Sequence, residues 1–133
     1  MQEELISPYV YAGIPATSLP KNIRKAIMKS NTMYLHKIIV DAIEEIMGIN
    51  LIEMQSKYMF RHITKARNIY CYYMQAYTKW TLFDIGESIG GRHHTSVMDS
   101  IKVHHELFET DPEFKEKSLA IKNIIEWKSQ ISI

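Results

Sequence analysis

The sequence predicts a small all-α fold, a helical bundle that contains a helix-turn-helix. Glycine and proline are scarce among the 133 residues, with five and four copies, which favours long helices and short connections. Apolar residues recur at helical spacing in several segments. A hydrophobic content of 46% can fill one core, and the chain is short for two domains. We therefore expect a single helical domain preceded by an irregular N-terminal arm.

The arm is predicted to cover residues 1–31, and the helical domain residues 32–133. Three prolines and one glycine interrupt residues 1–20, which lack periodicity, and a short helix is expected at 21–29. The arm is apolar around residues 6–14. It could therefore pack along the domain or supply a dimer contact, and both interpretations stay open at this point.

A single cysteine, Cys71, excludes an internal disulfide and a cysteine-based zinc module. Because Cys71 falls within an apolar helix, we expect its side chain to pack in the core rather than to act as a nucleophile. No secretory signal is visible, and no segment approaches the roughly 18 apolar residues that span a bilayer. These observations predict a cytoplasmic protein.

Polar residues at helix starts and a glycine at a helix end divide the first half of the domain. Thr32 is expected to cap a helix that ends at Gly48. Asn50 and Glu53 form a capping pair for a short helix through Ser56. These signals predict two helices before the basic region of the chain.

The remaining boundaries are predicted from similar signals. Residues 58–63 are expected to be a basic connection, after which Thr64 caps a helix. The last helix should begin after Asp111, with Pro112 at its first position, and continue to about Trp127.

Charge is distributed unevenly, although the formal net charge is only +1. No acidic residue occurs between Glu53 and Asp84, a stretch that holds five lysines and arginines interleaved with tyrosines and Trp80. Such a stretch suits contact with polyphosphate. A solvated basic helix face explains the charges equally well, so composition alone does not decide between the two.

Residues 81–108 carry the main functional signal. Thr81 and Asp84 are spaced as a capping pair. Gly90-Gly91 then permits a sharp reversal before a second helix that starts at about His93. Two helices joined by a tight glycine turn form the helix-turn-helix arrangement, whose second helix can enter the major groove of DNA.

The second helix begins with polar side chains, which are the type that contacts base edges. Val97, Ile101 and Phe108 follow at helical spacing and would anchor this helix to the core. The alternative is a surface helix of a generic bundle. The candidate DNA contacts on this helix are Arg92, His93, His94, Thr95, Ser96 and Ser100, with Lys102 as a further candidate.

A family resemblance favours the DNA-binding interpretation. The run Thr81-Leu82-Phe83-Asp84-Ile85-Gly86, followed by Gly90-Gly91-Arg92-His93-His94-Thr95-Ser96-Val97, resembles the signature of the C-terminal DNA-binding domain of DnaA, the bacterial replication initiator. The resemblance covers roughly residues 35–127. It implies a Trp-repressor-like bundle and sequence-specific binding of double-stranded DNA.

The resemblance also assigns roles by position. It gives Arg67 a contact in the minor groove and Arg92 a contact to the DNA backbone. His94, Thr95 and Ser96 correspond to the triplet that contacts bases. Together, pattern and resemblance predict DNA contacts by Lys65, Arg67, Lys79, Thr81, Arg92, His93, His94, Thr95, Ser96 and Ser100.

Three positions depart from the family pattern. His93 stands where the family has Asp, so a side chain that can donate to guanine or phosphate replaces an acceptor. Ser96 replaces Thr and lacks its methyl group, and Gln75 stands where Lys or Arg is usual. We therefore expect a DNA target related to the initiator's usual box but distinct from it.

The sequence lacks the Gly-x-x-x-x-Gly-Lys-Ser/Thr loop of the initiator's ATPase domain. We expect a protein that is not an enzyme: a free-standing relative from a phage or mobile element, or else an excised domain. Its expected role is in replication initiation or its regulation. A transcription regulator, or an adaptor that has lost DNA binding, is the alternative.

Double-stranded DNA is the expected partner, with a homodimer or replication proteins as further possibilities and no membrane contact. No cofactor is expected. His93-His94 and His104-His105 invite a metal-site interpretation, but their spacing lacks the paired histidines and carboxylate of a recognised site, so we expect no metal.

Overall fold

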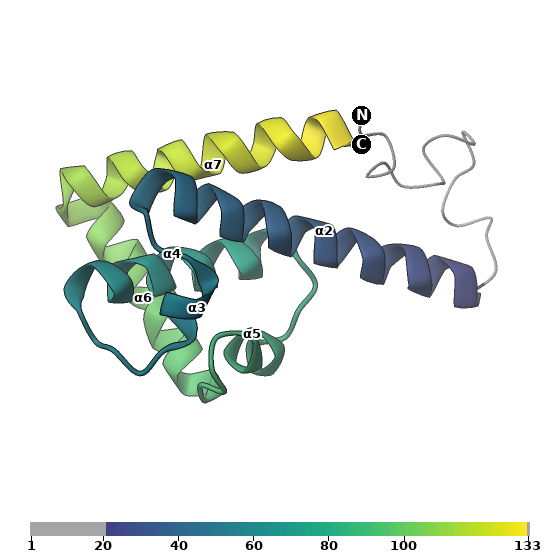
Figure 1. The fold of residues 1–133 in the computed structure, drawn as a ribbon, viewed down its shortest axis with the longest axis horizontal. Helices are drawn as coiled ribbons and strands as arrows, with labels where there is room; N and C mark the ends of the chain where they lie inside the picture. Colours follow the sequence, from purple (N-terminus) through teal and green to yellow (C-terminus); the bar gives the residue numbers. More distant parts are fainter. Residues whose placement is uncertain (1–20, 133) are drawn as a thin grey trace.

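The computed structural model describes residues 21–132, with side chains from 32 to 129. Every regular element in this range is an α-helix, which confirms the predicted fold class. Figure 1 shows α2 and α7 lying side by side above α4 and α6, with α5 near the bottom of the view. Residues 1–20 of the predicted arm, which covers 1–31, lie outside the described residues. The helices are α2 (Lys21–Met47), α3 (Leu51–Gln55), α4 (Arg61–Tyr77), α5 (Leu82–Ser88), α6 (His94–Thr110) and α7 (Pro112–Ser132).

The helix α2 is longer than predicted. It runs without a break from residues 21–29 through Thr32, so the predictions of a separate short helix and of a cap at Thr32 are wrong. The polar residues around Thr32 each cost less than about 1 kcal/mol inside a helix, which is too little to end it. The predicted end is confirmed, because Gly48 has a φ of +73°, the left-handed conformation common after helices.

Two predicted capping pairs are present and fix the starts of α3 and α5. The Asn50 side chain accepts a hydrogen bond from the Glu53 N–H at 2.8 Å, and Glu53 accepts from the Asn50 N–H at 3.0 Å. Thr81 and Asp84 exchange the same two bonds, both at 3.1 Å. Each pair satisfies two N–H groups that a helix start would otherwise leave free.

The start of α4 differs from the prediction, whereas that of α7 agrees with it. The Thr64 N–H already donates to the Phe60 carbonyl at 2.9 Å, so Thr64 lies inside α4 and does not cap it. The basic connection is correspondingly shorter. Before α7, Asp111 accepts from the N–H groups of Glu113 and Phe114 at 3.1 and 3.2 Å, as expected of a cap.

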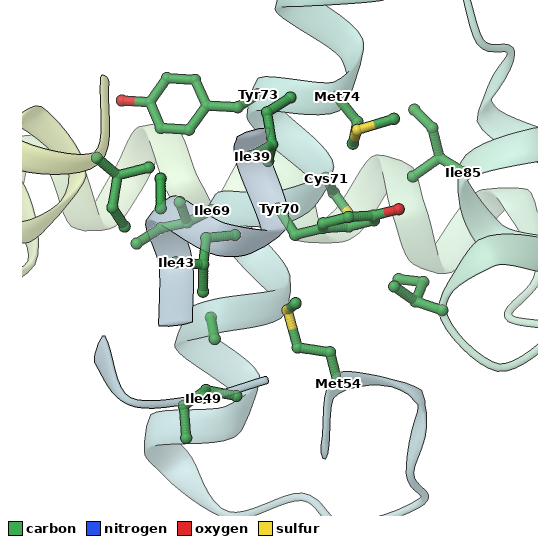
Figure 2. Packing of buried hydrophobic residues seen from close by; sticks show 14 of the residues in the cluster. Ile39, Ile43, Ile49, Met54, Ile69, Tyr70, Cys71, Tyr73, Met74 and Ile85 are labelled. Carbon is green, nitrogen blue, oxygen red and sulfur yellow. The ribbon is translucent and has the colours of Figure 1, made fainter. Parts of the chain in front are cut away.

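The core forms around α4, which packs against α2 on one side and α6 on the other. Figure 2 shows Ile39 and Ile43 of α2 facing Ile69 and Tyr70 of α4. Cys71 is fully buried, as predicted. The Tyr70 hydroxyl lies 2.6 Å from that of Ser88, which connects α4 to the end of α5. Within the described part of the chain, no helix is both long and apolar enough to cross a bilayer.

Candidate DNA interface

The turn between α5 and α6 depends on glycine at specific positions. Gly90 and Gly91 have φ values of +94° and +72°. A Cβ at Gly90 would lie 2.4 Å from the Gln55 carbonyl oxygen, whereas one at Gly91 would meet nothing within 4 Å. A Cβ at Gly86 would lie 2.1 Å from the Arg92 carbonyl oxygen. The two helices and the C-terminal end of α3 are therefore held in close contact at the turn.

His93 caps α6 with its ring. Nδ1 accepts a hydrogen bond from the Thr95 N–H at 3.2 Å and lies 2.8 Å from the Thr95 hydroxyl. Because Nδ1 accepts, the neutral ring carries its proton on Nε2, which is then available as a donor. The cap thus leaves His93 able to donate a hydrogen bond at the N-terminal end of α6.

The polar residues at the start of α6 are exposed and rigidly supported. His93, His94 and the two hydroxyl residues that follow are all exposed. Val97 and Ile101 are buried and anchor the same helix, as predicted. A row of exposed donors and acceptors is thereby held on a helix end that is anchored in the core, which is the geometry required of side chains that contact base edges.

Ser100 is placed less favourably than predicted. Its side chain is half-buried, and its hydroxyl hydrogen-bonds the buried thiol of Cys71. Burial raises the pKa of that thiol to about 12, which the hydrogen bond partly opposes. Ser100 therefore faces the α4 side of α6 at least in part.

Arg67, for which a minor-groove contact is predicted, has a buried side chain in the folded chain. Its side chain is only 3% exposed. Its Nε donates to the Met54 carbonyl at 2.8 Å, and Nη2 donates to the Ser56 carbonyl at 2.6 Å. A guanidinium bonded to these acceptors holds the C-terminal end of α3 against α4.

The Arg92 side chain also contacts the Ser56 carbonyl. Its Nη2 donates to Ser56 O at 2.8 Å, and its Nε is buried without a partner. Burial lowers the pKa of Arg67, and the neighbouring charge of Arg92 lowers it further. Two guanidinium groups thus meet at Ser56, and neither forms an ion pair with the described carboxylates. This concentrates positive charge beside the N-terminal end of α6.

The other predicted contacts lie in two places. Lys79 and Thr81 are exposed just before α5, where Thr81 also caps that helix. Lys65 instead pairs with Asp111 at 3.1 Å. Asp111 follows the C-terminal end of α6, so Lys65 is separated from the polar N-terminal end of that helix.

The sequence analysis missed an exposed apolar segment and misjudged the aromatic residues of the basic stretch. Tyr70 and Tyr73 are buried in the core, whereas Tyr58 is exposed together with Met59 and Phe60. The run of three large apolar residues directly before α4 is the signal that could have identified this segment. Among the described residues, no group of three His, Cys, Asp or Glu is arranged to hold a metal ion.

Comparisons with known proteins agree with this arrangement. The sequence profile of the family described as bacterial DnaA protein helix-turn-helix matches residues 36–103. The chain is 32% identical to the chromosomal replication initiator protein DnaA of Flavobacterium psychrophilum over 95 residues, which is 71% of this chain and 18% of that protein. No solved structure shows significant similarity to the chain.

Relatives from Rickettsia give the same result. The DnaA proteins of Rickettsia massiliae and Rickettsia rickettsii are each 31% identical over 107 residues, covering 80% of this chain and 23% of theirs. The chain therefore spans about a fifth of the length of the curated relatives it matches. The family match contains α5, the glycine turn and the N-terminal part of α6. The chain belongs to the bacterial DnaA helix-turn-helix family.

Proposed function

We propose that this protein binds double-stranded DNA sequence-specifically by placing the N-terminal end of α6 in the major groove. The observation that carries the proposal is the row of exposed polar side chains at 93–96 on a helix anchored by Val97 and Ile101. A helix in the major groove contacts bases through its first residues. His94, Thr95 and Ser96 offer donors, acceptors and one methyl group for this purpose.

Backbone contacts would orient the helix. Arg92 and Lys79 precede α6 and α5, and their side chains are half-buried and exposed, respectively. Arginine and lysine contacts to phosphate fix the register of a protein on DNA but carry no sequence information. We exclude Arg67 from this set because its guanidinium is buried.

A selection from randomised duplexes tests the proposal. We expect one motif to be enriched, and we expect His94→Ala to weaken its binding at least about tenfold, since one bidentate base contact contributes about 1–3 kcal/mol. His105→Ala, an exposed histidine farther along α6, is the matched control and should bind normally. Failure to enrich any motif would contradict sequence-specific binding.

The salt dependence of binding separates DNA binding from the adaptor alternative. Phe83 and Met98 on the two helices are 62% and 52% exposed, and such apolar side chains would suit a protein partner. If phosphate contacts dominate, affinity for duplex DNA must fall steeply as salt rises, by about 0.9 in log K per log salt for each phosphate. A protein that binds duplexes weakly at any salt would instead favour the adaptor.

For the biological role, we propose replication initiation or its regulation, carried out as a stand-alone relative of the initiator's DNA-binding domain. Support comes from the family and from the names of the matched relatives. Mapping where the protein occupies the genome tests this role. Occupancy at the origin supports it, and occupancy confined to promoters would support a transcription regulator.

A further inference from the structure

Three consecutive large apolar side chains are exposed between α3 and α4. Tyr58, Met59 and Phe60 are 63%, 70% and 58% exposed. An isolated exposed apolar side chain is ordinary, but an exposed run of three indicates a surface that contacts something. Nothing in α5 or α6 requires this run, so duplex binding by α6 leaves it unexplained.

The rings in this segment form an ordered stack, the aromatic ladder of Tyr58, Phe60 and His62. The Tyr58 and Phe60 rings are 5.5 Å apart and tilted by 22°. The Phe60 and His62 rings are 6.2 Å apart and nearly parallel, at 7°. Flat rings held parallel while exposed to solvent offer faces on which other flat rings can stack.

A basic groove continues from the aromatic ladder. His62 also lines a cavity of about 330 Å³ whose cations are Arg61, Lys65 and Lys117. Glu113 pairs with Lys117 at 3.5 Å and Asp111 pairs with Lys65 at 3.1 Å, which leaves Arg61 without an ion pair to a described carboxylate. Cations therefore outnumber carboxylates along the basic groove, which begins at His62, where the ring stack ends. This arrangement suits a nucleic-acid strand, which carries negative phosphates and flat bases.

The aromatic ladder is fixed next to the helix-turn-helix. Arg67 and Arg92 both bond the Ser56 carbonyl, and the Gln55 side-chain amide donates to the Ser88 carbonyl at 3.0 Å. The Tyr58 N–H also donates to the Ser56 hydroxyl at 3.3 Å. The segment before α4 is thus attached to the end of α5 and the start of α6.

We propose that the aromatic ladder and its basic groove bind single-stranded DNA, with bases stacked on the rings and phosphates along the cations. Unpaired bases expose the flat faces that a duplex hides, and aromatic residues beside a positive groove are the usual means of binding them. The choice of DNA over RNA rests on the proposed function of α6. The ring stack itself favours a single strand over a duplex.

Binding of fluorescently labelled oligothymidylate to the full chain tests this proposal. Tyr58→Ala and Phe60→Ala should each weaken binding about fivefold or more, because each removes one stacking partner. Tyr58→Phe should bind normally, since it keeps the ring. Trp127→Ala removes an equally exposed aromatic, 63% exposed on α7, and should bind like the unchanged protein.

A random-sequence duplex of equal length is measured in parallel, and urea unfolding confirms that each variant remains folded. The proposal is supported if the ring variants lose affinity for oligothymidylate but keep their affinity for the duplex. It is overturned if they bind oligothymidylate normally, lose both affinities equally, or if oligouridylate binds more tightly than oligothymidylate. Because the duplex selection described above is a separate measurement, failure of α6 to select a motif would be distinguishable from failure of the aromatic ladder.

Discussion

At the scale of single residues, the Ser56 carbonyl has an unusual role, since it accepts hydrogen bonds from both Arg67 and Arg92. A buried guanidinium is tolerated only when its donors are satisfied. Arg67 meets this condition with the backbone carbonyls of Met54 and Ser56. We therefore expect Arg67 to act on DNA binding only through the fold, whereas we propose that Arg92 contacts DNA directly.

Replacing Arg67 by methionine should destabilise the protein. The variant loses charge-assisted hydrogen bonds to two carbonyls, each contributing about 1.5–3 kcal/mol, while relief of the repulsion from Arg92 offsets part of the loss. We expect a decrease of about 2–4 kcal/mol in the free energy of unfolding, measured in urea. Arg92→Met should lose less stability and more DNA affinity. An Arg67 variant of normal stability that had lost only its preference for bases in the minor groove would restore the original prediction.

His93 is the residue that we expect to alter the DNA target. Aspartate can also cap α6, so His93→Asp should leave the fold intact while replacing the Nε2 donor by an acceptor. We expect the preference at one base pair to change from guanine towards cytosine by about 1–3 kcal/mol. Competition between duplexes that differ at that pair measures the change. His93→Asn, which keeps both a cap and a donor, is the control, and an unchanged preference in the Asp variant would refute the assignment.

The sequence located the exposed polar residues at 93–96 because a contiguous motif identifies them. It could not locate Arg67, because the burial of this side chain depends on carbonyl groups of Met54 and Ser56 that approach it only in the folded chain. The inward placement of Ser100 has the same cause, since it follows from the position of α4. A local sequence pattern carries no information on contacts between segments that are distant along the chain.

At the scale of elements, the glycine turn sets the angle between α5 and α6. Position 90 requires glycine for two reasons. The backbone there has a positive φ, and a Cβ would lie 2.4 Å from the Gln55 carbonyl oxygen. Position 91 requires glycine only because of its positive φ, since a Cβ there would meet no atom within 4 Å. The requirement for glycine is therefore stricter at position 90 than at position 91, although the two are adjacent in the motif.

Alanine substitutions at these two glycines should separate the two requirements. Gly91→Ala should cost about 1–2 kcal/mol, the penalty for a left-handed alanine. Gly90→Ala carries the same penalty and also forces the C-terminal end of α3 to move, so we expect a loss of more than about 3 kcal/mol and weakened DNA binding. Urea unfolding and duplex titration measure both effects. Equal losses at the two positions would show that the contact with Gln55 does not constrain the turn.

Helix boundaries were predictable wherever a side chain forms the cap. The pairs at Asn50 and Thr81 and the cap at Asp111 all occur as expected. Thr32 and Thr64 looked equally suitable but lie inside helices, because the residues before them continue the backbone hydrogen bonding. A polar residue permits a helix to start, but the packing of α2 and α4 in the core decides whether the helix extends beyond it.

At the scale of the whole molecule, His104 joins three helices within the core. Its ring stacks on Tyr72 of α4 at 4.0 Å, and its Nε2 lies 2.9 Å from the Ser118 hydroxyl of α7. The Nδ1 atom is buried without a partner. Burial, with a smaller contribution from the neighbouring His105, lowers the pKa of His104 to about 4. The packed core therefore accommodates the neutral ring and opposes its protonation.

This buried ring predicts how the stability of the whole domain depends on pH. The folded pKa of about 4 lies below the ordinary value of 6.5, so between these values the unfolded chain binds more protons than the folded one. Stability should be unaffected by His104 above pH 6.5 and should fall as the pH drops towards 4, by at most about 3 kcal/mol. Burial also lowers the pKa of His36, which adds to the loss in the same direction. Urea unfolding between pH 7 and pH 4 measures the dependence.

Variants assign this pH dependence to its source. His104→Gln keeps a donor for Ser118 but cannot titrate, so it should lower stability at pH 7 and flatten the decrease towards pH 4. His105→Gln, an exposed position on the same helix, should retain the full decrease. Asp111 lies outside this window: the Phe114 N–H and Lys65 lower its pKa below 3.8, so its contribution is lost only in more acidic solution. If the His104 variant kept the original pH profile, the core histidine would not be the group whose protonation unfolds the domain.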